Sequence, residues 1–189
     1  MSWKNTADHW GAVSKLLHWL IVLLVLVLAV VGLTMGELPK TPKYFWVYTL
    51  HKSTGITVLA LVLVRIAWRL YAGAPKPVPG TPTWQARIAS LTHLALYALL
   101  LAMPLSGWLY DSASGLRPFR WYGLVEMPKL SPPNEGLRGL SHDAHELLFW
   151  VLATLVVVHA AAALYHHVFQ NDDTLRRMLP GRRGARHPG

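Results

Sequence analysis

The sequence predicts an all-α protein, an integral membrane four-helix bundle that forms a single domain over residues 1–189. Hydrophobic residues make up 53% of the chain and charged residues 14%, whereas roughly 25% of the residues of soluble domains are charged. Four apolar runs are each long enough to cross a bilayer. Ten histidines occur in a chain without cysteine, so imidazole is the main metal-binding group that we expect.

The absence of cysteine excludes several classes of chemistry. Disulfides, iron–sulfur clusters, thiolate zinc sites, thiol nucleophiles and haem attached through a CxxCH motif all need a thiol. The net charge of +9 could indicate a nucleic-acid partner. In a membrane protein, however, basic residues at the ends of the spans explain such a charge better, so we expect no nucleic acid.

The first two spans differ in how uniform they are. The first is predicted at about 16–35, a run of twenty residues without charge. It exceeds a signal-peptide core and is followed by no clear cleavage site, so we expect it to be retained. The second, at about 47–70, begins less cleanly with His51 and Lys52. Near its other end, Arg65 and Arg69 are four residues apart and share one helix face.

The second half of the chain contains the other two spans. The third is predicted at about 88–110 and carries His93 and Pro104; the proline should kink or weaken it. A proline-rich connector precedes it, and a long outer loop, 111–144, should follow it. In that loop we expect a short surface helix and interfacial aromatic residues. The fourth span is predicted at about 145–169, followed by a basic, partly disordered cytoplasmic tail, 171–189.

The distribution of basic residues predicts the orientation. Four spans put both termini on one side of the membrane. That side carries eleven lysines and arginines, three of them Arg182, Arg183 and Arg186 in the tail, and the opposite side carries seven. Because basic loops are retained in the cytoplasm, we expect both termini of this multi-pass protein to be cytoplasmic.

Four histidines sort into two depths within the predicted spans. His145 and His159 are fourteen residues apart, about 21 Å along a helix and about 40° short of four whole turns, so they share one face. His18 begins the first span at the depth of His159, and His51 begins the second at the depth of His145. One imidazole from each of two helices is what bis-histidine ligation of haem b requires. The pairs His18/His159 and His51/His145 therefore predict two haem b groups.

Other interpretations of these histidines remain open. A single histidine in a span often forms an interhelical hydrogen bond, which would make this a non-haem membrane protein with structural histidines. Zinc or copper also binds imidazole, although two nitrogens alone make a poor closed site. His142 competes with His145 because it lies three residues earlier on a similar face. Haem propionates would need cations, for which Arg65 and Arg69 are candidates at one end and Lys52 at the other.

Four segments resemble the bacterial cytochrome b561 family, whose members are small four-helix di-haem cytochromes of the inner (cell) membrane. They are KLLHWL around His18, LHKSTGI around His51, LTHLALYALLLAMPLSGW around His93, and the stretch from HDAHELLFW through HAAAALYHH to NDDTLRRMLP near the end. The resemblance covers nearly the whole chain. It implies that His18, His51, His145 and His159 bind the haem irons, in agreement with the depth argument.

The resemblance also implies electron transfer between membrane ubiquinone and a partner, and it raises superoxide as a substrate at the periplasmic face. His93, Arg87 and His166 are then candidates for a quinone site, against interhelical bonding or interfacial snorkelling as their plainer roles. Four loop cations could steer an anion: Arg117, Arg120, Lys129 and Arg138. Nearby acids favour a mixed solvated loop instead. As an alternative function, the chain would be the haem-bearing anchor subunit of a larger dehydrogenase or hydrogenase.

Overall fold

A computed structural model describes residues 2–39 and 41–179. Four long helices dominate it: α1 (Ala12–Met35), α2 (Phe45–Ala72), α3 (Thr83–Ala113) and α4 (Glu135–Val168). A 3-10 turn, η1 (Pro42–Tyr44), precedes α2, and a two-stranded antiparallel hairpin, β1 (Arg120–Trp121) and β2 (Val125–Glu126), lies between α3 and α4. All four helices are long and apolar enough to cross a membrane. The predicted fold class, a membrane helical bundle, is therefore confirmed.

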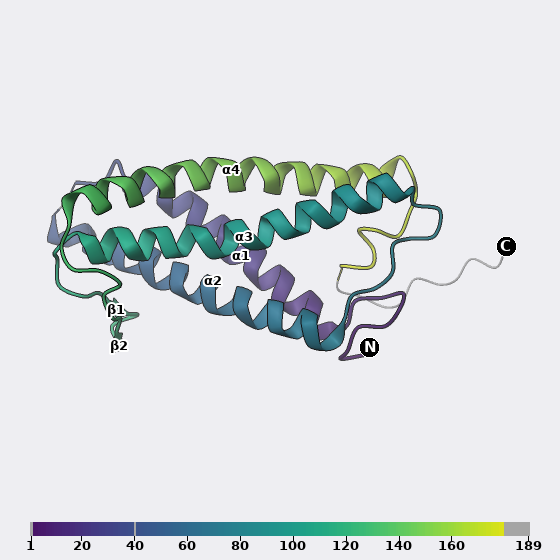
Figure 1. The fold of residues 1–189 in the computed structure, drawn as a ribbon, viewed down its shortest axis with the longest axis horizontal. Helices are drawn as coiled ribbons and strands as arrows, with labels where there is room; N and C mark the ends of the chain where they lie inside the picture. Colours follow the sequence, from purple (N-terminus) through teal and green to yellow (C-terminus); the bar gives the residue numbers. More distant parts are fainter. Residues whose placement is uncertain (1, 40, 180–189) are drawn as a thin grey trace.

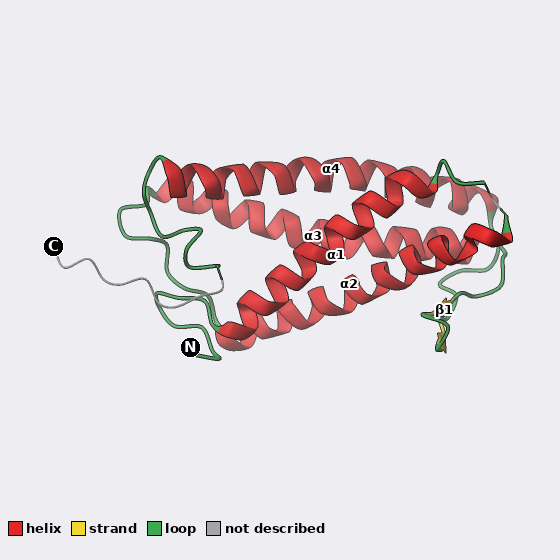
Figure 2. Ribbon diagram, turned by 180° about the vertical axis from the view of Figure 1, so that it is seen from behind, coloured by secondary structure: helices red, strands yellow, loops and turns green. Residues whose placement is uncertain are grey.

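The helices run up and down in sequence order, and each packs against the next (Figure 1). The N-terminal segment, the connector between α2 and α3, and the residues after α4 gather at one end, which we call the terminal end (Figure 2). The hairpin lies at the other, the hairpin end (Figure 1). Among the described residues, no Cα atom of α4 comes within 8 Å of one in α1 or α2. The backbones of α1 and α2 are thus well separated from that of α4.

The exterior of the bundle is apolar and its protein-buried core is small. Ile21, Val58 and Val62 form the buried cluster, which joins α1 to α2. Many leucines and valines, such as Leu26 and Leu94, are instead exposed on the outer faces. Exposed aliphatic side chains on spanning helices are what contact with acyl chains requires, so the lipid completes the burial of these helices.

The helix ends differ from the predicted spans. The fourth helix begins at Glu135, ten residues before the expected start. Asn134 caps it by accepting a hydrogen bond from Leu137 N at 2.8 Å, a signal that the search for apolar runs missed. The connection after α3 is therefore shorter than 111–144, and the surface helix expected there is wrong, because it holds the hairpin instead. Pro104 lies inside α3, which continues to Ala113.

The tail is described only in part. Residues 171–179 form turns that pack back on the terminal end. Residues 180–189, with Arg182, Arg183 and Arg186 of the basic tail, lie outside the described residues.

Candidate functional site

Two pairs of facing histidines lie between α4 and the first two helices. The ring centroids of His18 on α1 and His159 on α4 are 6.5 Å apart. Those of His51 on α2 and His145 on α4 are 6.3 Å apart. The structure thus brings together the same partners that the depth argument matched. Each pair bridges helices whose backbones do not approach within 8 Å in the described part of the chain.

The spacing within each pair fits one iron held between two imidazoles. Two rings that bind a metal from opposite sides, each with a metal–nitrogen distance of about 2 Å, have their centroids about 6 Å apart. Across residues 2–39 and 41–179, no cluster of three or more histidine, aspartate or glutamate side chains could hold a metal ion. A two-imidazole site without further protein ligands suits haem, because the porphyrin supplies the other four nitrogens.

Hydrogen bonds select the tautomer of a neutral His145. Its Nδ1 lies 3.0 Å from the carbonyl oxygen of Met103 and 3.0 Å from Ser106 Oγ, both on α3. A carbonyl can only accept, so Nδ1 carries a proton and donates it. In the neutral ring, Nε2 then has the free lone pair that can bind a metal, and the contacts with α3 orient the ring.

Glycines lie against the two histidines at the hairpin end. A Cβ atom added at Gly107 would lie 2.9 Å from Cε1 of His145, and one added at Gly32 would lie 3.2 Å from Cε1 of His51. Both distances are shorter than ordinary carbon–carbon contact. His51 Nδ1 is buried and has no hydrogen-bond partner among the described residues. A buried polar atom of this kind marks a place where a further group belongs.

Cationic and aromatic side chains surround the pair at the terminal end. Arg65 donates to the carbonyl oxygen of Ser14 at 2.7 Å and to the hydroxyl of Tyr97 at 3.2 Å. The guanidinium of Arg69 lies 5.9 Å from the centre of the same Tyr97 ring. The ring of His93 lies 5.4 Å from that of His159. Tyr97, which sequence reasoning missed, thus contacts both predicted arginines, and Arg65 also reaches Ser14, four residues before His18 on α1.

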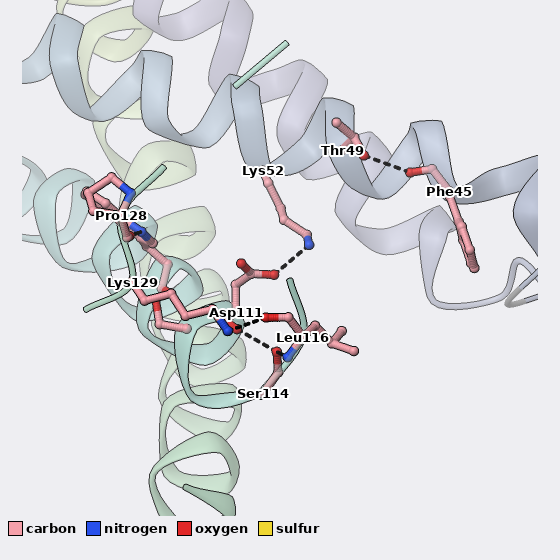
Figure 3. Close-up of polar contacts among 10 residues, drawn as sticks. Phe45, Thr49, Lys52, Asp111, Ser114, Leu116, Pro128 and Lys129 are labelled. Atoms are coloured by element: carbon pink, nitrogen blue, oxygen red, sulfur yellow. Dashed lines mark hydrogen bonds and ion pairs between the residues drawn. The ribbon is translucent and has the colours of Figure 1, made fainter. Parts of the chain in front are cut away.

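Lys52 has a carboxylate partner at the hairpin end. Its Nζ lies 2.6 Å from Oδ1 of Asp111, near the end of α3 (Figure 3). The Asp111 side chain is 9% exposed. The ion pair joins α2 to α3 next to His51. Lys52, the expected partner of a haem propionate, is therefore already paired with a carboxylate. Sequence reasoning missed Asp111, because no local pattern relates these two segments.

The remaining quinone candidates are dispersed. No hydrogen bond or ring contact among the described residues joins Arg87 or His166 to His93, and Arg87 is exposed on the first turns of α3. His166 Nδ1 lies 2.7 Å from Oδ2 of Asp172. Burial raises the pKa of the Asp172 carboxyl, but hydrogen bonds from Thr174 and His166 outweigh burial and leave this pKa lowered.

The competing ligand and the loop cations lie at the hairpin end. The ring of His142 stacks edge-on against Tyr110 at 5.3 Å. These two residues and Arg138 line an open pocket of about 400 Å³ together with Glu135. Lys129 instead donates to the carbonyl of Leu116 (Figure 3). Arg120 faces Glu126 across the hairpin. Of the four loop cations, Arg138 is the one that lines this pocket.

The segment after α4 returns to the start of α1. Nε1 of Trp19 donates to the carbonyl of Met178 at 2.9 Å, and Nζ of Lys15 donates to that of Leu179 at 2.9 Å. Trp19 also packs edge-on against His18 at 5.3 Å. We call residues 169–179 the strap, because they join α4 to α1 at the end where His18 and His159 face each other. Sequence reasoning did not find this contact, since it depends on the tertiary fold.

A membrane four-helix bundle with facing histidines on separate helices is the architecture of a membrane-bound b-type cytochrome. Comparison with known proteins identifies the family. A family model for prokaryotic cytochrome b561 matches residues 9–181. The chain belongs to this family, so the resemblance found in the sequence is confirmed. It is a membrane electron-transfer protein, and its family implies haem b.

Individual relatives match over almost the full length. The chain is 34% identical to "Cytochrome b561 homolog 2" of Escherichia coli (strain K12) over 186 residues, which cover 95% of each chain. It is 34% identical to "Cytochrome b561 homolog 1" of the same organism over 88% of this chain and 94% of the relative. It is also 33% identical to "Probable superoxide oxidase CybB" of Yersinia pestis over 89% of this chain and 94% of the relative.

Proposed function

We propose that this protein is a di-haem b-type cytochrome that carries electrons across the bacterial inner membrane, with both termini in the cytoplasm. One observation carries the proposal: α4 presents His145 and His159 on one face, and each faces a histidine on another helix, at 6.3 and 6.5 Å. The terminal end would be cytoplasmic and the hairpin end periplasmic, in line with the distribution of basic residues.

In this proposal each histidine pair holds one haem b, which supplies a one-electron carrier. His18 and His159 would hold the haem at the cytoplasmic end, and His51 and His145 would hold the one at the periplasmic end. With two protein nitrogens for each iron, the sites would favour outer-sphere electron transfer over oxygen chemistry. The Met103 carbonyl holds a proton on Nδ1 of His145, which leaves Nε2 for the iron, and its hydrogen bond makes the imidazole a stronger donor.

The protein's cations would balance the charge of the propionates. Arg65 and Arg69 lie beside the cytoplasmic pair, where Arg65 keeps donors available beyond its two bonds to protein oxygens. Lys52 contributes less at the periplasmic end, because Asp111 already offsets its charge.

We further propose that ubiquinone exchanges electrons at the cytoplasmic end. His93 packs against His159, and a neutral imidazole there can bind a quinone carbonyl and exchange a proton. His166, held by Asp172, would exchange protons with water at the rim. Arg87, exposed on α3, would lie at the entrance from the lipid rather than in contact with the quinone.

Superoxide is the proposed donor at the periplasmic face. The similarity to a relative named as a probable superoxide oxidase supports it. In the pocket beside His142, Arg138 is the cation that could attract an anion, with the carboxylate of Glu135 opposing it. Each of two superoxide anions would lose one electron and become oxygen. One ubiquinone would take up these two electrons and two protons and become ubiquinol.

Stopped-flow spectroscopy of the purified protein tests this function. The protein would be mixed separately with ubiquinol and with superoxide while the haem band is followed. Reduction by both, and reoxidation by ubiquinone, is the expected result. Reduction by ubiquinol alone would remove superoxide from the proposal. Reduction by neither, with other subunits copurifying, would favour the anchor-subunit alternative.

A further inference from the structure

The hairpin between α3 and α4 is held by hydroxyl groups on the side of a membrane-spanning helix. Ser53 Oγ accepts a hydrogen bond from Tyr122 N at 2.9 Å, and Thr54 Oγ1 lies 3.1 Å from the Tyr122 hydroxyl. Nε1 of Trp121 donates to Thr57 Oγ1 at 3.1 Å. Ser53 is fully buried. The polar residues that interrupt the start of this span therefore hold the hairpin.

If α2 is taken to be centred across the bilayer, these contacts lie below the level at which the helix enters the membrane. The helix has 28 residues and is about 42 Å long, about 12 Å longer than the hydrocarbon core of a bilayer. If this extra length is shared equally between the two ends of α2, about 6 Å of the helix lies outside the hydrocarbon at the hairpin end. Ser53 is eight residues after Phe45 and Thr57 twelve, about 12 and 18 Å along the helix. The turn of the hairpin is therefore bound at the depth of the acyl chains nearest the headgroups.

The polarity of the hairpin changes with this depth. At its base, Arg120 faces Glu126, and Lys52 lies 5.6 Å from the centre of the Phe119 ring. Its tip, in contrast, exposes apolar side chains: Leu124 is 69% exposed and Val125 57% exposed. Charge at the base and exposed aliphatic residues at the tip are typical of an element that crosses the membrane interface.

The backbone N–H groups of the tip are bonded within the protein, which lowers the cost of placing them in a lipid environment. Gly123 N donates to the carbonyl of Arg120 at 3.1 Å, and Leu124 N to that of Trp121 at 2.9 Å. Tyr122 N donates to Ser53. Tyr122 and Gly123 both have positive φ, 46° and 76°, which closes the turn tightly. For a tyrosine this conformation is strained and persists only when its surroundings hold it, so the contacts with α2 fix the turn.

We propose that the hairpin, residues 119–127, is inserted into the membrane leaflet at the hairpin end, with Leu124 and Val125 in contact with lipid acyl chains. The tip lies alongside α2 at that end of the bundle (Figure 1). Leu63, further along α2, is likewise exposed on the outer surface of the spans. The chemical partner is therefore a lipid, the one that already surrounds the spans, rather than a second protein.

Site-directed spin labelling tests this insertion directly, because a chain without cysteine can be labelled at one chosen position. Leu124→Cys would be labelled with a nitroxide in the full-length, haem-loaded protein and reconstituted in phosphatidylcholine–phosphatidylglycerol vesicles. Collision with oxygen, which concentrates in lipid, is compared with collision with a water-soluble nickel chelate. Leu63→Cys provides the reference for lipid and Arg117→Cys, exposed in the loop after α3, the reference for water.

We expect the Leu124→Cys label to resemble the lipid reference, with nickel collisions several-fold fewer than at the water reference and with free access to oxygen. Nickel collisions as frequent as at Arg117→Cys would put the tip in water and overturn the proposal. Exclusion of both reagents would mean that protein covers the tip, a second copy or another subunit, and would overturn it as well. Val125→Cys, also at the tip, repeats the test if the first variant fails to assemble with haem.

Discussion

Replacing Gly107 with alanine should displace His145 and impair the haem site at the hairpin end. The added Cβ would lie 2.9 Å from Cε1 of the imidazole and 3.2 Å from Nδ1. Ordinary carbon–carbon contact begins near about 3.5 Å, so the ring must move by about half an ångström or more. The ring cannot move freely, because the groups that hold it, Met103 O and Ser106 Oγ, belong to the same helix as Gly107. Weakening these two hydrogen bonds costs about 1–3 kcal/mol in total.

The assay is the haem b content and the reduced absorption spectrum of the purified variant. We expect Gly107→Ala to lose up to half of its haem or to change the spectrum of the affected haem. Gly139→Ala on α4 is the matched control, because nothing lies within 4 Å of a Cβ atom added there. Alanine at an open helical position should stabilise the helix by about 0.5–1 kcal/mol. A Gly107→Ala protein with the haem content and spectrum of the control would refute the coupling between this glycine and His145.

Three further predictions concern the charges and the strap. Asp111→Asn should destabilise the protein by about 1–2 kcal/mol, because it leaves the partly exposed Lys52 without its carboxylate; unchanged thermal unfolding, relative to the wild type, would contradict this. Trp19→Phe keeps an aromatic ring but removes the hydrogen bond that joins the strap to α1. The loosened strap should let a water-soluble reductant reduce the haem at the terminal end faster, and rates equal to those of the wild type would contradict this. The pKa of Asp172 is lowered in the folded state. The contribution of its carboxylate to stability is therefore present above the unfolded pKa of about 4 and is lost as the pH falls through the folded pKa. Below a pH of about 4, the melting temperature of the Asp172→Asn protein should fall less steeply than that of the wild type, and parallel curves would contradict a stabilising role for this carboxylate.

The membrane architecture could be predicted from the sequence because lipid contact demands long apolar runs, and such runs are visible without a structure. The histidine partners could also be matched, since a spanning helix converts sequence position into depth. His145 and His159 share a face of α4 for this reason, and the structure brings each to its expected partner. Their role as haem ligands remains a proposal.

The features that were missed depend on contacts between distant segments. Asp111 meets Lys52 across fifty-nine positions, and no local pattern indicates such a pair. The first turns of α4 are polar, so a search for apolar runs cannot detect them, although the Asn134 cap is a local signal for a helix start. The hairpin was mistaken for a helix because Ser53 and Thr57, which hold it, lie on α2 far from it in sequence.

The haem content of single histidine variants tests the central claim most directly. The wild-type protein should contain two haem b groups for each chain, by spectrophotometric assay of extracted haem. His51→Ala and His145→Ala should each lose the haem with one spectrum, and His18→Ala and His159→Ala the haem with the other. Loss of the same haem from the His51→Ala and His159→Ala proteins, or a wild-type chain without a b-type absorption band, would contradict the account.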